Sequence, residues 1–338
     1  MGNRRPPSAL RTPRRFDVPG GRFDNRVGLG VSLVDGRPAR VEVCPFTQRR
    51  PEVLPSRFEY HLAASLEEAL ELLATHGEEA KVLAGGQSLI PLMKLRFAAP
   101  ERLIDINRIP GLDGIEERDG FLRIGPLARH NQIAGNDLIR TRFPVMAAAA
   151  PQISDPLVRN LGTLAGSLVH CDPAGDWGSV MLALGGSVVA RSVDGEREIP
   201  IAEFLQEAFT TSLAPNEIVT EVRVPSPSAG SNGTYLKMER KVGDFATVAV
   251  AVHVAMSNGT IGSAGIALTA VGPRNLKAKQ AEARLAGAEP GEDVFADAGR
   301  LAAEASEPIS DVRGSADYKR HVVEVFVRRG LAAATRAA

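Results

Sequence analysis

The chain has 338 residues, enough to bury a substantial core, and this length predicts two or three domains. Lys and Arg together number 40, as do Asp and Glu, so the overall charge favours neither nucleic acid nor an anionic membrane surface as a partner. The two cysteines, Cys44 and Cys171, are too few to ligate an iron–sulfur cluster, and they favour a reducing cytoplasm. No apolar run approaches the ~20 residues that span a bilayer.

Residues 1–52 differ in composition from the rest of the chain. They contain 11 Arg, seven Pro and six Gly, but no Lys and only five acidic residues. Such a composition predicts a disordered segment, or a translation start assigned too early, with the chain beginning near Val53. Pro, Asp and Gly follow the arginine pairs at 4–5 and 14–15 in place of a hydrophobic segment, which argues against an export signal.

Regular structure is predicted from Phe58 onward. Ser65 and Glu68 form a capping-box pattern, which predicts a helix that begins at Leu66 and ends at Gly77. The elements that follow predict a small βαβ unit: a strand over 82–84, a glycine turn at 85–86, a short helix from Pro91 and a strand over 103–106.

A second region, 109–225, is predicted to combine short strands and helices. Its expected elements are a strand at 121–124, helices near 130–133, 145–150 and 177–184, a hairpin turning at 194–195 and a strand at 217–224. Alternation in the last strand places Ile218, Thr220, Val222 and Val224 on one face. Residues 225–233 have the composition of a linker.

The third region is predicted to begin with antiparallel strands and to end in helices. The expected strands cover 234–240, 246–256 and a segment through 266–269 that follows the Asn258-Gly259 turn, and the expected helices cover about 275–286, 293–305 and 317–335. The sequence contains no internal repeats.

Two glycine-rich loops are the candidate functional features. Gly85 and Gly86 follow a strand, and Gly162 and Gly166 lie among small residues that would allow a ligand to approach the backbone. Either loop alone is more typical of an ordinary turn, whereas two loops of matching character favour a phosphate-bearing cofactor held by backbone amides. No G-x-G-x-x-G follows a strand, so a Rossmann site is not predicted.

Several polar residues lie beside the second loop. Arg159 is expected to pair with a carboxylate or a phosphate. Asp176 opens a helix, where it would serve as an N-cap or accept hydrogen bonds from ribityl or ribose hydroxyls. His170, Cys171 and Asp172 are adjacent, but consecutive residues of an extended segment face opposite sides, so we expect packing near a cofactor and no metal site. Trp177 is expected in the core or an interface.

Four segments carry a resemblance to a known family: AGGQSLIPLMKLR, RLIDINRIPGL, DPLVRNLGTLAGSLVHCDPAGD and YLKMERKVGDFATV. Together they resemble the FAD-binding medium subunit of molybdenum hydroxylases, the family of aerobic carbon monoxide dehydrogenase and xanthine dehydrogenase. The similarity covers roughly residues 53–335 in one register. Family members begin close to Val53, so we favour the misassigned start, and a mature N-terminus at Met1 or Gly2 in mass spectrometry would contradict it.

The resemblance implies an α+β fold. An FAD-binding domain of the vanillyl-alcohol-oxidase (PCMH) type would occupy residues 53–228, in subdomains of about 53–107 and 108–228. A C-terminal flavoprotein domain of antiparallel sheet and helices would occupy residues 229–338. In two places the chain departs from the family pattern: Ala165 stands where a glycine is common, and Gln87 stands where carbon monoxide dehydrogenases often have histidine. Gln87 therefore does not favour carbon monoxide as the substrate.

The resemblance also implies a cofactor site for non-covalent FAD. The first loop would hold the pyrophosphate through backbone amides, the second loop the other side of the cofactor, and Phe245 would cover the flavin. The implied FAD-binding residues are Leu83, Ala84, Gly85, Gly86, Gln87, Ser88, Leu89, Ile90, Thr163, Leu164, Ala165, Gly166, Ser167, Asp176, Ile218, Val219, Lys237 and Phe245. No catalytic acid or base and no metal ligand is implied in this chain.

The implied function is electron transfer within a heteromeric dehydrogenase. A large partner would hold molybdopterin, and a small partner would hold [2Fe-2S] clusters, in a dimer of heterotrimers. FAD would then pass electrons to NAD or a quinone. Two alternatives stay open: a free-standing flavin oxidase or dehydrogenase of the same fold, and a scaffold whose flavin site has decayed. The substrate of such a complex does not follow from this sequence.

Overall fold

The computed structural model describes residues 54–336. The chain divides into a unit of residues Met1–Glu52 and a unit of residues Val53–Ala338, and all described residues belong to the second. The expectations for residues 1–52 therefore lie outside the described residues. Among the helices from residue 54 to residue 336, none is both long and apolar enough to cross a membrane.

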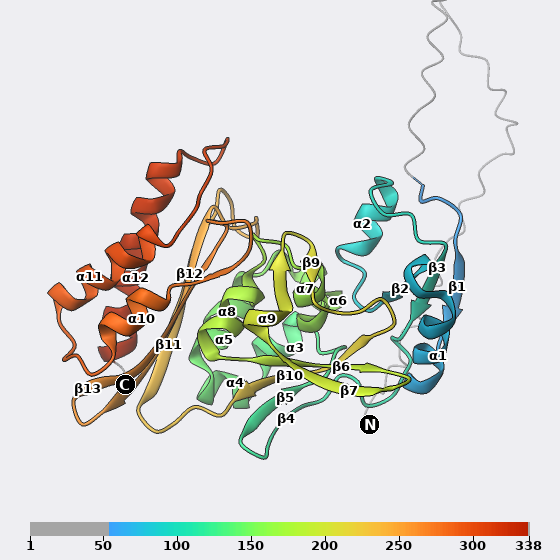
Figure 1. Ribbon diagram of the computed structural model, residues 1–338, viewed down its shortest axis with the longest axis horizontal. Helices are drawn as coiled ribbons and strands as arrows, with labels where there is room; N and C mark the ends of the chain where they lie inside the picture. The colour runs from blue at the N-terminus through green and yellow to red at the C-terminus, as the bar shows by residue number, and fades with distance from the viewer. Residues whose placement is uncertain (1–53, 337–338) are drawn as a thin grey trace, which may run out of the picture. The chain divides into compact units, whose positions relative to one another are not determined.

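The described elements are mostly short (Figure 1). The helices are α1 (Leu66–His76), α2 (Leu89–Lys94), α3 (His130–Gly135), α4 (Asp137–Arg142), α5 (Pro144–Ala149), α6 (Pro156–Leu161), α7 (Leu164–His170), α8 (Asp176–Leu184), α9 (Ile201–Phe204), α10 (Lys279–Leu285), α11 (Glu292–Glu304) and α12 (Ala316–Arg336), with short 3₁₀ turns η1 (Gly77–Glu79) and η2 (Ala150–Gln152). The strands are β1 (Glu59–Leu62), β2 (Ala80–Leu83), β3 (Arg102–Asp105), β4 (Ile115–Arg118), β5 (Phe121–Ile124), β6 (Ser187–Ser192), β7 (Gly195–Pro200), β8 (Leu205–Glu207), β9 (Thr210–Thr211), β10 (Ile218–Pro225), β11 (Ser231–Met238), β12 (Val248–Ser257), β13 (Thr260–Thr269) and β14 (Leu276–Lys277).

The first sheet is parallel and has the order β1-β3-β2. Because β2 and β3 are parallel neighbours joined through α2, the predicted βαβ unit is confirmed. The predicted cap of α1 is also confirmed, since Ser65 Oγ accepts from Glu68 N at 3.1 Å, although the Glu68 carboxylate accepts from Ala64 N and not from Ser65 N. Leu70 and Leu73 of α1 pack with Ile104 of β3 in one buried cluster.

The second sheet is antiparallel, with the order β4-β5-β10-β6-β7. The prediction that Ile218 shares a face with Val222 and Val224 is wrong. A β-bulge between Val219 and Glu221 shifts the register of β10, so that Val219 joins Val222 and Val224 in the main core. Ile218 packs instead in the cluster of the parallel sheet.

The third sheet, β11-β12-β13-β14, is covered by helices on both faces (Figure 1). Alternation along β12 explains this arrangement: Val248, Val250 and Val252 pack with α10–α12, whereas Ala249 and Ala251 face the core that contains α5 and α8. The small alanines allow α8 to approach closely. The end of the predicted linker at 225–233 is also wrong, because residues from Ser231 onward already pair with β12.

Candidate functional site

The first glycine loop connects β2 to α2 through residues 84–88. Gly86 has φ +71°, a left-handed conformation that an L side chain rarely adopts. Within the described part of the chain, the N–H groups of Gly85, Gly86, Gln87 and Ser88 donate to no acceptor. A run of successive free amides in a turn is a binding site for an anion. Leu83, Ala84 and Leu89 beside it are half-buried, and Ile90 is partly exposed.

Only Gly162 and Thr163 of the predicted second loop lie between α6 and α7, because residues from Leu164 onward form the first turn of α7. Thr163 caps α7, because its Oγ1 accepts from Gly166 N at 3.0 Å and its backbone oxygen accepts from Ser167 N at 3.0 Å. Leu164 and Ala165 are buried in the main core. A ligand at this loop would therefore meet the exposed Gly166 and the half-buried Ser167, and would not meet Leu164.

Tertiary packing brings the two loops into contact. A Cβ atom on Gly85 would overlap Leu161 O and lie 2.8 Å from Cα of Gly162. A Cβ atom on Gly162 would in turn lie 2.8 Å from His130 Nε2. Both glycines are thus required by close approach, in addition to any role in ligand binding.

A buried histidine, His130, packs against Gly162 of the second loop. His130 N donates to Gly162 O at 3.0 Å, and His130 Nδ1 accepts from Trp177 Nε1 at 3.0 Å. Burial, together with the charges of Arg159 and Arg129, lowers the pKa of His130 to about 4. The imidazole is therefore neutral at pH 7 and carries its proton on Nε2, beside Gly162. Trp177 is fully buried, so its expected place in the core is confirmed.

Asn107 and Arg129 were not selected from the sequence, yet they join the two loops. Asn107 Nδ2 donates to Ala84 O at 2.8 Å, and Arg129 Nη2 donates to Asn107 Oδ1 at 2.5 Å. Arg129 Nη1 donates to Leu161 O. The motif RLIDINRIPGL contains Asn107 and was an available signal, but its polar residue after a strand is also typical of an ordinary turn.

Asp176 belongs to a buried charged cluster with Lys237. The Asp176 carboxylate accepts from Tyr235 Oη at 2.6 Å and from Lys237 Nζ at 3.1 Å, and Lys237 Nζ also donates to Gln152 O at 3.0 Å. Burial raises the pKa of Asp176, and this rise is opposed by Lys237 and Tyr235. The interpretation of Asp176 as an N-cap is wrong: Gly175 is the capping residue, and the Asp176 side chain points to β11.

Phe245 lies on the loop between β11 and β12, and its side chain is 54% exposed. Two contacts fix the backbone of this loop. Glu239 Oε1 accepts from Gly243 N at 3.2 Å, and Arg313 Nη1 donates to Phe245 O at 3.1 Å. An exposed aromatic ring on an anchored loop is available to stack on a planar ligand.

The other predicted residues have varied surroundings. Arg159 donates to the carbonyl oxygens of Ile153 and Ser154, at 3.0 and 2.7 Å, so its guanidinium stabilises a turn. Ile218 and Val219 are both buried. Among residues 54–336, no three His, Cys, Asp or Glu side chains are grouped so as to hold a metal ion.

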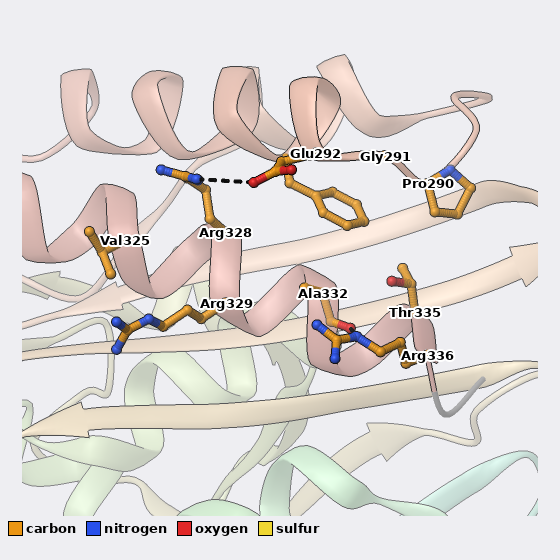
Figure 2. A pocket seen from close by; sticks show the side chains of 10 residues that line it. Pro290, Gly291, Glu292, Val325, Arg328, Arg329, Ala332, Thr335 and Arg336 are labelled. Atoms are coloured by element: carbon orange, nitrogen blue, oxygen red, sulfur yellow. Dashed lines mark hydrogen bonds and ion pairs between the residues drawn. The ribbon is translucent and has the colours of Figure 1, made fainter.

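A cavity of about 730 Å³ lies elsewhere, between the start of α11 and one face of α12 (Figure 2). Arg328 reaches toward Glu292, 3.8 Å away, and Arg336 Nε donates to Ala332 O at 3.1 Å, whereas Arg329 extends along α12 (Figure 2). The three guanidinium groups do not converge on a common point, and neither glycine loop contributes to the lining. This cavity is therefore not a candidate for the cofactor site.

Comparison with known proteins identifies the family. Residues 56–227 match the model of the FAD binding domain in molybdopterin dehydrogenase, and residues 233–334 match that of the CO dehydrogenase flavoprotein C-terminal domain. The carbon monoxide dehydrogenase medium chain of Hydrogenophaga pseudoflava is 40% identical over 282 residues, which are 83% of this chain and 98% of that one. The 6-hydroxypseudooxynicotine dehydrogenase complex subunit alpha of Paenarthrobacter nicotinovorans is 38% identical over 83% of this chain and 95% of its own length.

Solved structures agree with the sequence comparisons. The structure of carbon monoxide dehydrogenase from Hydrogenophaga pseudoflava that lacks the Mo-pyranopterin moiety matches with a TM-score of 0.81 and 43% identity, over 83% of this chain and 98% of that chain. Reconstituted CO dehydrogenase from Oligotropha carboxidovorans matches with a TM-score of 0.82 and 36% identity, over 84% of this chain and all of that one. The chain therefore belongs to the FAD-binding medium subunits of the carbon monoxide dehydrogenase family of molybdenum hydroxylases.

Proposed function

We propose that this chain is the electron-transfer flavoprotein of a heteromeric molybdopterin-dependent dehydrogenase, and that it passes electrons from iron–sulfur clusters on a partner subunit to NAD or a quinone. The observation that carries the proposal is the run of four free amides, from Gly85 to Ser88, in a loop that is in backbone contact with a second glycine-containing segment. This arrangement fits the pyrophosphate of FAD, because the free amides supply hydrogen-bond donors and the glycines allow the two loops to approach each other closely.

The other family positions complete the proposed site. Of residues 163–167, the exposed Gly166 and the half-buried Ser167 would contact the opposite side of FAD, with the Ser167 hydroxyl as a donor. Asp176 and Lys237 are buried in their own ion pair, so their part in the proposed site would be to support it and not to contact FAD directly. Phe245 would cover the ring system from its anchored loop. FAD, when bound, supplies the redox chemistry, while the protein supplies position, burial and local dipoles.

In the proposed complex the substrate is oxidised on a different subunit from this one. Relatives of similar identity are named for different dehydrogenases, among them those of carbon monoxide, 6-hydroxypseudooxynicotine and glyceraldehyde. A subunit that selects the substrate is expected to differ between enzymes with such different substrates, whereas these flavin subunits are similar. We therefore propose a molybdopterin-binding large subunit and a [2Fe-2S] small subunit as partners, in a dimer of heterotrimers, and a cytoplasmic complex in keeping with the two cysteines of the sequence.

The test is an absorption spectrum of the purified chain, with the released cofactor identified after acid denaturation. We expect one FAD per chain, released without covalent attachment, and no turnover of small-molecule substrates by the chain alone. Addition of the partner subunits should allow substrate to reduce the flavin, and candidate acceptors should reoxidise it. Turnover by the isolated chain would favour the free-standing flavoenzyme, and the absence of flavin after incubation with FAD would contradict both.

A further inference from the structure

We propose that Asn107 and Arg129 are positioning residues that set the spacing of the two glycine loops for FAD, an inference that rests on the proposed function. Asn107 follows β3, and Arg129 directly precedes α3. Their side chains form one continuous hydrogen-bonded bridge from Ala84 O to Leu161 O. We call this pair the Asn107–Arg129 bridge.

The orientation of the Asn107 amide is determined by its neighbours. Ala84 O and the Asp105 carboxylate can only accept, and they lie 2.8 and 2.7 Å from Asn107 Nδ2. The amide oxygen must therefore face Arg129, which can only donate. The Asp105 carboxylate also accepts from Tyr60 Oη at 2.6 Å, so the hydrogen bonds that orient Asn107 reach as far as β1.

The bridge has a direct consequence for the first loop. In a trans peptide the carbonyl oxygen and the following N–H point in opposite directions. Since Asn107 binds Ala84 O, the N–H of Gly85 is directed away from the bridge, and this N–H is the first of the four free amides. Asn107 thereby determines the direction in which the amide run begins.

At the other end, the bridge holds the second loop. Leu161 is the last residue of α6, so its carbonyl oxygen has no partner within the helix, and the Arg129 guanidinium binds it. Backbone pairing reinforces this contact. His130 N donates to Gly162 O at 3.0 Å, and Leu164 N donates to Ala128 O at 3.3 Å. Arg129 thus ties the start of the second loop to the strand end that carries the first.

The charge of Arg129 also suits the proposed ligand. No carboxylate of residues 54–336 forms an ion pair with its guanidinium, which instead donates to two neutral oxygens. Burial lowers the pKa of Arg129, whereas Asp113 and Asp105 are near enough to favour its charged form and oppose that fall. Neither carboxylate is paired with it, so the guanidinium between the two loops favours a negatively charged group nearby. A planar guanidinium can bind both oxygens at once, whereas an ammonium group would bind them only as a point charge.

The test compares the affinity for FAD of four apoproteins: the wild type, Arg129→Met, Asn107→Ala and the double variant. Binding is monitored by the quenching of flavin fluorescence. We expect each single variant to raise the dissociation constant at least about tenfold, which corresponds to about 1.4 kcal/mol. The double variant should lose no more than about the larger single effect, because both residues act through one bridge. Arg129→Lys should recover part of the affinity and provides a folded variant if Arg129→Met does not fold.

Arg123→Met is the matched control. Arg123 is a partly buried arginine whose partners, Asp119 and Glu221, lie away from both loops. We expect it to change the melting temperature without changing FAD affinity. If the wild type binds FAD and Arg129→Met and Asn107→Ala bind it with the same affinity, this inference is overturned while the proposed function stands. The same holds if Arg123→Met loses as much FAD affinity as they do. Failure of the wild type to bind FAD would overturn the proposed function, and this inference with it.

Discussion

Gly85 of the first loop lies directly against Gly162 of the second, with room for no side chain between them. A Cβ atom on Gly85 would overlap Leu161 O and lie 2.8 Å from Cα of Gly162. The first loop follows a strand of the parallel sheet, whereas Gly162 lies between two helices 77 positions further along the sequence, so their contact depends on how the parallel sheet packs on the main core. This contact determines how the free amides of the first loop face the second.

Gly85→Ala is expected to separate the two loops. The added methyl group has backbone on its nearest side, which cannot rotate away, so the loop must shift at a cost of about 1–3 kcal/mol. We expect FAD content to fall by at least about tenfold, because the amide run is displaced from the second loop. FAD per chain after gel filtration is the measurement. Gly114→Ala is the control, because a Cβ atom there would meet open space, and equal FAD loss in both variants would contradict the prediction.

Lys237→Met is expected to destabilise the FAD-free protein by about 3–5 kcal/mol, because it leaves the Asp176 carboxylate buried without its cationic partner. The double variant Asp176→Asn/Lys237→Met should be more stable than Lys237→Met, since the most deeply buried unpaired charge is removed, while Glu239 loses its ion pair with Lys237 in both variants. Urea unfolding of both FAD-free variants measures the difference. Lys277→Met removes a more exposed ion pair with Glu282 and should cost less than about 1 kcal/mol. Equal losses in the single and double variants would contradict this account.

The His130–Trp177 pair is expected to make stability depend on pH. The folded pKa of about 4 lies below the ordinary value of 6.5, so the stabilisation is complete above pH 6.5 and is lost as the pH falls toward 4. The difference between the two pKa values corresponds to a contribution of roughly 3 kcal/mol to the free energy of unfolding. His130→Gln keeps an acceptor for Trp177 Nε1 but does not titrate. Urea midpoints between pH 7 and pH 4.5 should therefore fall less steeply in His130→Gln, and parallel curves would rule out this role of His130.

Phe245→Ala is expected to leave FAD bound and to change the rate at which acceptors reoxidise it. The ring is 54% exposed, so its loss should change the free energy of unfolding by less than about 0.5 kcal/mol. Stopped-flow reoxidation of the reduced protein provides the rate. Val242→Ala, on the same loop and 97% exposed, is the matched control and should leave that rate unchanged. An unchanged rate in Phe245→Ala would remove Phe245 from the proposed flavin site.

Local patterns in the sequence were sufficient for most of the elements and for the position of the glycine loops. The βαβ unit follows from a strand, a glycine turn and a second strand close in sequence, and the capping pattern at Ser65 identifies the start of α1. The strand over 246–256 is likewise predicted from the sequence, and the structure shows that its alternating valines and alanines face two different cores. Each of these features depends on residues that are near neighbours in the chain.

The bulge in β10 and the partners of the polar side chains were decided only by the tertiary structure. Ile218 leaves the face of Val222 because the pairing with β6 shifts, which alternation alone does not reveal. Asp176 meets Lys237 across 61 positions, and Arg129 meets Asn107 across 22. By itself the sequence determined most of the strands and the longer helices, because those preferences are local, but it did not reveal that residues 164–167 begin α7 or that residues 276–277 form β14. Which side chains join the two loops was determined by packing between sheets, because hydrogen bonds between distant residues form only once the core has fixed their distance.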